Sequence, residues 1–313
     1  MIFSFSVPSK VILFGEHAAV YGFPTVASAI DLRMFLNCSL YECNTDSEVR
    51  ITYNNDKFNF DPFSNFEDEN STFKMYRKAF KNNFPHNHIL KMNFTFNGPD
   101  EAGIGSSSSL CALVAATVQY IKNHGNIDKN KIIEHANELE QFYHSKSSGI
   151  DINTVVNGSS IIIRNGKLEK LSLPKIPLLI VDSGVKRQAK KALDHISDLV
   201  LKDKENTMSK LKSLGLIAEK FYEAKDKLNL KKFFTNSQDL LVSLGLSCPQ
   251  IDDIVQRAKQ NDLCAKLTGA GMGGVVLVSG NDVIEKRKIF EPYQTYVIHL
   301  ESEGFRCEKS SLF

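Results

Sequence analysis

The spacing of hydrophobic and polar residues predicts a mixture of strands and helices in the first half of the chain. In residues 89–96 apolar side chains occupy every second position, which places them on one face of a strand. Between residues 110 and 121 apolar residues recur at helical spacing, and Gly125 stands where a helix usually ends. Asp128 is suited to cap a second helix, whose apolar stripe runs to Tyr143. Residues 54–71, rich in Asn, Asp and Phe, lack periodicity and are expected to form a long surface loop.

The pattern changes in the second half of the chain. Residues 159–163 and 178–181 are apolar runs typical of strands, and residues 188–261 are mostly helical in pattern and rich in lysine. Strands return in residues 266–279 on either side of a glycine-rich turn. We therefore predict a mixed fold with two domains, residues 1–170 and 171–313.

Composition narrows the class of protein. Hydrophobic residues make up 42% of the 313 residues and charged residues 24%, an ordinary globular balance. The net charge of +2 is too small to indicate a nucleic-acid partner. Six cysteines lack the CxxC spacing of zinc sites, and no apolar run approaches the roughly 18 residues of a membrane span. Residues 1–7 carry no basic residue, so we expect a reduced, cytoplasmic protein without a leader or membrane contact.

A loop rich in glycine and serine, residues 99–109, follows the predicted strand and precedes the predicted helix. Glycines at 103 and 105 let the backbone approach an anion closely, and the first turn of a helix offers N–H groups to a phosphate. Serine hydroxyls add donors and can bind magnesium. The alternative is a serine that merely caps an ordinary helix. The chain contains no GxxxxGK[ST] sequence, so this is not a Walker A loop.

A second glycine run, residues 269–274, contains the spacing GxGxxG. A dinucleotide-binding fingerprint opens a helix, but here an apolar strand pattern follows, which excludes that interpretation. A tight loop that presents backbone groups to a ligand and a plain hairpin turn both remain open. Near the start of the chain, Lys10 precedes an apolar run that ends at Gly15 and is followed by Glu16 and His17. Taken alone, these residues favour an ordinary surface lysine followed by a turn.

Two carboxylates follow the loop. Glu140 lies at the edge of the apolar stripe of its helix, with His144 one turn later on the same face. A carboxylate beside a core requires a cation or hydrogen-bond donors, and either magnesium or a lysine would serve. Asp151 lies in a turn that opens a short helix, where it could cap the helix or act in catalysis. Spacing alone does not choose between these roles.

Four segments, in order, resemble the GHMP kinase family. They are residues 8–22 (PSKVILFGEHAAVYG), residues 102–109 (AGIGSSSS), the segment Ser148-Gly149-Ile150-Asp151 with Glu140 and His144 upstream, and residues 266–274 (KLTGAGMGG). The resemblance extends from about residue 8 to residue 279. Some positions depart from the family pattern: Ser9 and Met272 replace glycines, Ser147 a proline, Ser108 and Ser109 alanines, and Ala189 a threonine.

The resemblance implies a two-domain α+β fold. Its N-terminal domain would be like ribosomal protein S5 and its C-terminal domain ferredoxin-like, with the active site in the cleft between them. In this family the last strand can return to the first domain, which concerns residues 297–313. Relatives often form dimers, which leaves a homodimer open.

The resemblance also implies a reaction. The opening segment is most similar to family members that use ATP and magnesium to phosphorylate the primary hydroxyl of mevalonate. Asp151 would orient or deprotonate that hydroxyl, and Lys10 would neutralise charge on the transferred phosphate. Arg187 would pair with the acceptor's carboxylate. The remaining expected contacts are Gly103, Gly105, Ser106, Ser107, Ser108 and Ser109 for ATP, Ser106 and Glu140 for magnesium, and Glu16, His17 and Gly271 for the acceptor.

Other readings remain. A family member that acts on phosphomevalonate would need a more basic acceptor pocket. A galactokinase-like enzyme usually has an Arg/Asn-rich run before its Gly-Glu-His element, in place of the apolar residues after Lys10. A nucleotide-binding regulator without catalytic activity would have no need of Asp151.

Overall fold

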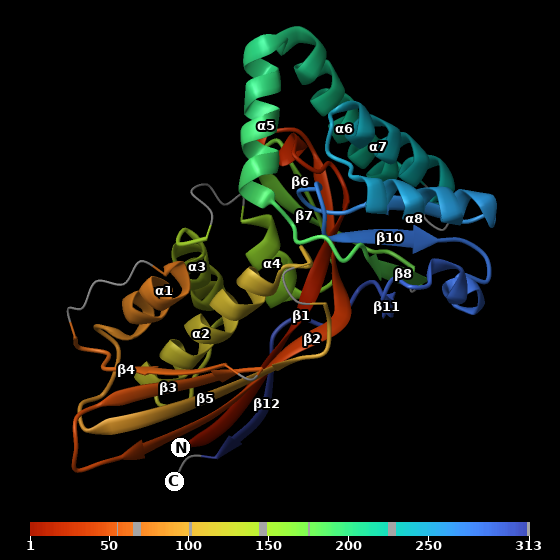
Figure 1. The fold of residues 1–313 in the computed structure, drawn as a ribbon. Coiled ribbons are helices and arrows are strands. Elements are labelled where there is room, and N and C mark those ends of the chain that lie inside the picture. The colour runs from red at the N-terminus through yellow and green to blue at the C-terminus, as the bar shows by residue number, and fades with distance from the viewer. Residues whose placement is uncertain are drawn as a thin grey trace.

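Two β-sheets with helices packed against them make up the fold (Figure 1). The computed structural model describes residues 1–54, 56–64, 70–99, 102–143, 149–174, 176–224 and 230–311. In the first sheet the strands run in the order β12-β1-β2-β5-β3-β4, and β6 joins β2 to β7. These strands are β1 (Ile2–Phe14), β2 (Thr25–Glu42), β3 (Glu48–Tyr53), β4 (Asp56–Phe60), β5 (His88–Phe96), β6 (Ser160–Arg164), β7 (Lys167–Leu171) and β12 (Arg306–Ser311).

Four helices cover one face of this sheet and form a common core with it (Figure 1). They are α1 (Ser71–Phe80), α2 (Ser106–Lys122), α3 (Lys129–Glu140) and α4 (Ile150–Asn157). Helix α2 is buried almost all round, because its residues are small or apolar on every face. It begins at Ser106, so the four serines expected in the loop form its first turn. Asp128 caps α3 by accepting a hydrogen bond from the Asn130 N–H, as expected.

The second sheet has the order β11-β8-β10-β9, with every neighbouring pair antiparallel. Its strands are β8 (Pro177–Asp182), β9 (Cys264–Leu267), β10 (Val275–Ser279) and β11 (Thr295–His299). The helices of this part are α5 (Ala189–Lys202), α6 (Lys204–Glu223), α7 (Lys231–Ser243) and α8 (Pro249–Gln260), with the short η1 (Ala18–Tyr21) and η2 (Glu285–Phe290). The first and third strands occupy the middle, which is the ferredoxin-like order, and the predicted two-domain α+β class is confirmed.

The chain passes from the first sheet to the second after β7 and returns with β12, which pairs with β1. We propose that residues 1–170 together with β12 form the N-terminal domain. One expectation from the sequence is wrong: residues 54–71 are not simply a loop, since β4 pairs along β3 and buries Phe60. Cross-strand pairing there outweighs the weak alternation of the sequence. Within the described ranges, no helix is both long and apolar enough to cross a membrane.

Candidate active site

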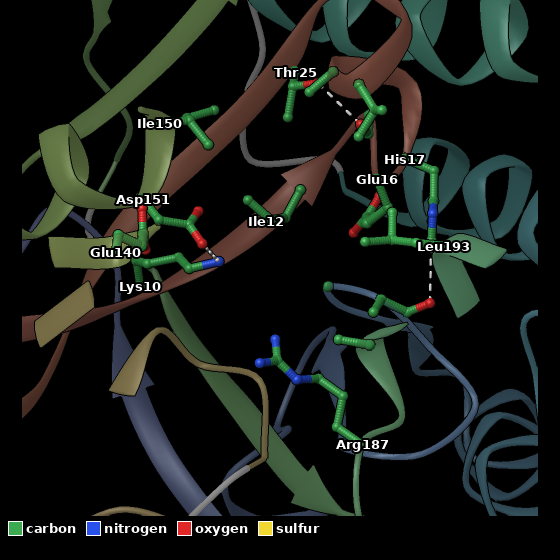
Figure 2. A pocket seen from close by; sticks show the side chains of 16 residues that line it. Lys10, Ile12, Glu16, His17, Thr25, Glu140, Ile150, Asp151, Arg187 and Leu193 are labelled. Carbon is green, nitrogen blue, oxygen red and sulfur yellow. Dashed lines mark hydrogen bonds and ion pairs between the residues drawn. The ribbon is translucent and has the colours of Figure 1, made fainter. Parts of the chain in front are cut away.

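Strand β1 and helix α4 bring Lys10 and Asp151 together in the first domain. The Lys10 ammonium lies 2.9 Å from a carboxylate oxygen of Asp151. Figure 2 marks this ion pair with a dashed line. Lys10 is only 3% exposed, so it requires a partner, whereas Asp151 is 30% exposed and faces a cavity. Asp151 stands in the first turn of α4, where the helix dipole favours a negative charge.

The loop before α2 passes directly beside Lys10. The backbone N–H of Lys10 donates to the Ile104 carbonyl at 2.9 Å. A Cβ atom at Gly105 would lie 2.8 Å from Lys10 Cγ, and Gly105 has a φ of +85°, so both space and conformation require glycine. Gly105 also caps α2 without a side chain, which leaves the first N–H groups of the helix available to a ligand.

The four serines of the loop point in different directions. Ser106 and Ser107 are half-buried and line a cavity. Ser108 and Ser109 are fully buried: the Ser108 hydroxyl donates to Glu140, and the Ser109 hydroxyl donates to the Pro8 carbonyl at 3.2 Å. The hydroxyls of Ser108 and Ser109 are therefore occupied inside the protein, whereas Ser106 and Ser107 face a cavity.

Glu140 ends helix α3 at the first turn of α2. Its side chain is almost completely buried, accepts the Ser108 hydrogen bond and lines the same cavity as Asp151. A carboxylate and a hydroxyl are hard oxygen donors of the kind that magnesium prefers. His144, together with Ser147 and Ser148, lies outside the described residues.

Glu16 forms an ion pair with Lys266 that joins the turn after β1 to strand β9 of the second sheet. Neither side chain is exposed, and burial raises the pKa of Glu16, with the Lys266 ammonium opposing that rise. The second carboxylate oxygen of Glu16 is buried without a hydrogen-bond partner among the described residues, although Glu16 lines the cavity. This oxygen therefore retains an unused acceptor position.

His17 is held as a neutral imidazole. Its Nε2 lies 2.8 Å from the Ala270 carbonyl oxygen. Because a carbonyl oxygen can only accept, Nε2 carries the hydrogen. Figure 2 shows His17 beside Glu16 at the wall of the cavity. Burial lowers the pKa of His17, the Ala270 contact opposes this, and a nearby His195 adds to it. Nδ1 is thus an acceptor, and it is buried without a partner among the described residues.

The glycine run of the second domain, residues 269–274, contributes to one wall of the cavity. Thr268 accepts a hydrogen bond from the Ile12 N–H at 3.0 Å and donates to the Ile12 carbonyl at 2.8 Å, which fastens this run to β1. Gly269 and Ala270 line the cavity. Gly271 does not, because it packs under Leu246, whose carbonyl oxygen would be 2.4 Å from a Cβ at this position.

Arg187 reaches the site from the segment between β8 and α5, and Figure 2 shows its guanidinium directed into the cavity. Sequence reasoning assigned no role to Lys266, Thr268 or Ala270. Two of them carried a signal: Lys266 is a charged residue within a buried strand, and Thr268 a polar residue directly before a glycine turn.

Two adjoining cavities share Arg187 and Ala189 in their walls. The first, of about 170 Å³, contains Lys10, Asp151 and the other polar groups described above. The second, of about 530 Å³, is lined by Ser106 and Ser107 and by aromatic rings. Those rings are Tyr53, Phe58, Tyr76 and Tyr143. The first turn of α2 therefore lies where a polyphosphate could connect an aromatic-walled chamber to a small polar one.

Comparisons with known proteins agree with this arrangement. The family model for the N-terminal domain of GHMP kinases matches residues 70–159, and the model for their C-terminal domain matches residues 217–286. The mevalonate kinase of Methanocaldococcus jannaschii is 29% identical over 304 residues, which cover 91% of this chain and 94% of that protein.

Solved structures show the same fold. The crystal structure of the mevalonate kinase from Methanococcus jannaschii superposes with a TM-score of 0.79 at 24% identity, covering 96% of this chain and 98% of that one. Lactococcus lactis galactokinase in complex with galactose has a TM-score of 0.75 at 16% identity, with coverage of 97% and 95%. Since kinases of different substrates share this fold, the fold does not identify the acceptor.

Proposed function

The chain belongs to the GHMP kinase family, whose two models together match just over half of it, and we propose that it transfers the γ-phosphoryl group of ATP to the primary hydroxyl of mevalonate. The products would be ADP and 5-phosphomevalonate. The observation that carries this proposal is the Lys10–Asp151 pair beside the first turn of α2, at the wall of a small polar cavity.

The nucleotide would occupy the larger cavity. Its aromatic walls suit a base and sugar, and the first-turn N–H groups of α2 suit the phosphates. Gly103 and Gly105 allow the backbone to approach the phosphates closely, and the hydroxyls of Ser106 and Ser107 add donors. The γ-phosphate would then point towards Lys10.

Lys10 and Asp151 would carry the transfer step. Asp151 is the more exposed of the two and can accept the proton of the acceptor hydroxyl, or hold that hydroxyl in line with the γ-phosphate. The Lys10 ammonium would offset the negative charge that gathers on the transferred group. Most of the rate enhancement would come from this positioning and charge neutralisation.

Magnesium is the divalent ion that this chemistry requires, and the residues present fit it. Glu140 and Ser106 would hold it at the start of α2, where the Ser108 contact fixes the Glu140 carboxylate. When bound, the ion neutralises phosphate charge and orients the γ-phosphoryl group.

The smaller cavity would bind the acceptor. Arg187 offers a planar cation for a carboxylate. The acceptor atoms of Glu16 and His17 that lack partners among the described residues require a donor, and a ligand hydroxyl supplies one. A hydroxy acid with one primary hydroxyl satisfies all three requirements, and mevalonate is the substrate named for the M. jannaschii relative.

A single assay tests this proposal against other acceptors. Release of ADP is measured with mevalonate, phosphomevalonate, galactose and homoserine, with and without Mg²⁺. We expect turnover with mevalonate, and loss of at least about 1,000-fold in Asp151→Asn with ATP binding retained. Turnover with phosphomevalonate or galactose alone would reassign the acceptor. ATP binding without turnover on any acceptor would favour a regulator.

A further inference from the structure

Residues 300–305, between β11 and β12, lie against the C-terminal end of helix α4. We call this segment the C-terminal strap. The Phe305 N–H donates to the Val156 carbonyl at 2.9 Å, and Gly158 forms an isolated β-bridge with Glu303. Val156 belongs to the last turn of α4, whose carbonyl groups lack partners within the helix. The strap therefore completes the end of this helix.

The strap and the C-terminal end of α4 are in contact through their backbone atoms. A Cβ atom at Gly304 would lie 2.2 Å from the Val156 carbonyl oxygen, and one at Gly158 would lie 2.2 Å from the Gly304 nitrogen. Neither neighbour is a flexible side chain that could move aside. A displacement of the strap would therefore displace the C-terminal end of α4 as well.

Arg33 of β2 holds the strap from its other side. Its guanidinium donates to the carbonyl groups of Glu303 and Gly304, the latter at 2.8 Å, and to the Ser6 carbonyl at 3.1 Å. Arg33 is only 8% exposed, and although burial lowers its pKa to about 10, it stays charged at neutral pH. Ser6 lies on β1, the strand that carries Lys10, so Arg33 ties the strap to that strand.

Helix α4 has only eight residues, a length of about 12 Å, and Asp151 stands in its first turn. Because so short a helix moves as a rigid unit, a displacement of its C-terminal end would also displace Asp151. Lys10 would not follow, because β1 is paired with β2 on both sides of it. The separation of Lys10 and Asp151 therefore depends on where the strap holds α4.

We propose that Arg33 and Gly304 are positioning residues for phosphoryl transfer, which keep Asp151 against Lys10 through the C-terminal strap. This inference rests on the proposed function, in which Asp151 faces the acceptor hydroxyl. Neither residue lines the ATP or acceptor cavity, so their effect reaches the reaction through α4.

The test compares Gly304→Ala and Arg33→Lys with a matched control, Arg306→Gln. Arg306 contacts the Glu303 carboxylate of the same strap at 2.8 Å, but from the solvent side, where Arg306 is 40% exposed. Steady-state kinetics with ATP and mevalonate are normalised to the folded protein, and hydrogen exchange is followed in residues 150–158. We expect kcat to fall by about 10- to 100-fold in both variants, with KM for each substrate within about twofold. Exchange in α4 should accelerate, and the control should match the wild type.

Several outcomes would overturn the positioning role. One is an unchanged kcat per folded molecule in either variant. Another is a rise in KM with kcat retained, which would indicate a direct effect on binding. If Gly304→Ala does not fold, Arg33→Lys decides, since it keeps the charge but loses the planar fork that reaches several carbonyls. Absence of wild-type turnover with mevalonate would instead refute the proposed function.

Discussion

Lys266 and Glu16 form a wholly buried ion pair that joins strand β9 of the second sheet to the turn after β1. The Lys266 ammonium also donates to the Leu267 carbonyl at 2.7 Å and lies 5.9 Å from the centre of the Phe234 ring. Glu16 stands at the wall of the acceptor cavity. The pair thus fixes the two domains to each other directly behind the place where the substrate would bind.

Breaking this pair is expected to destabilise the protein strongly. Lys266→Met leaves the Glu16 carboxylate buried without its cation, which costs about 3–5 kcal/mol in the free energy of unfolding. Urea unfolding measures the change. The double variant Lys266→Met/Glu16→Leu removes both charges and should recover most of the loss. A double variant as unstable as the single one would show that packing around Lys266, and not its charge, stabilises the domain contact.

Gly105 is expected to support a high turnover rate because of its contact with Lys10. Gly105→Ala adds a Cβ atom 2.8 Å from Lys10 Cγ, which would push the ammonium away from Asp151. Gly166→Ala is the matched control, since Gly166 has a similar φ of +70° with no atom within 4 Å of its added Cβ. Both variants pay about 1–2 kcal/mol for the left-handed backbone.

The two glycine variants should nevertheless differ in turnover. We expect kcat to fall by at least about tenfold in Gly105→Ala and to stay near the wild-type value in Gly166→Ala, in assays normalised to folded protein. Equal losses in both would mean that backbone strain, and not the displacement of Lys10, accounts for the effect.

The free energy of unfolding should decrease below pH 6.5, in part because of His17. Burial lowers the pKa of His17 below its ordinary 6.5, so the unfolded chain binds a proton that the folded protein excludes. The stability contributed by neutral His17 is therefore present above pH 6.5 and is lost as the pH falls through the lowered folded pKa. The slope is at most about 1.4 kcal/mol per pH unit.

Urea unfolding at a series of pH values tests this. His17→Asn should flatten the slope below pH 6.5, and asparagine tolerates the left-handed backbone at this position, where φ is 61°. Burial lowers the pKa of His135 as well, so some slope should remain in the variant. An identical slope in the variant and the wild type would mean that His17 takes up its proton equally in both states.

The sequence predicted elements well where local patterns govern the backbone. The alternation in residues 89–96 corresponds to β5, and the strand–turn–strand pattern in residues 266–279 to β9 and β10. Strand β4 lies inside the stretch expected to be a loop, because a strand of five residues gives only a short alternation and is stabilised by pairing along β3. The sequence could not indicate that Ser108 turns inward to Glu140, since that follows from the packing of α2 on α3.

The candidate site likewise combines residues that local motifs predicted with residues that only the tertiary structure brings together. Family-like motifs singled out Lys10 and Asp151, and both line one cavity with Glu140. The Lys266 ion pair and the Arg33 contacts to the strap join residues more than 200 positions apart. No spacing rule reaches that far, because such contacts depend on how the two sheets and the returning strand are assembled.

Glu140 is expected to set the magnesium requirement of the reaction. Glu140→Gln removes the charge while keeping the shape of the side chain and an acceptor for the Ser108 hydroxyl. The Mg²⁺ concentration for half-maximal turnover should rise about 10-fold or more at fixed ATP. Glu138→Gln, an exposed position on the same helix, controls for the loss of one negative charge and should leave the titration unchanged.

Nucleotide affinity measured with and without Mg²⁺ gives a second readout that does not require turnover. A Glu140→Gln titration that coincides with the wild type would show that this carboxylate only anchors α3 to the first turn of α2 and takes no part in holding the ion.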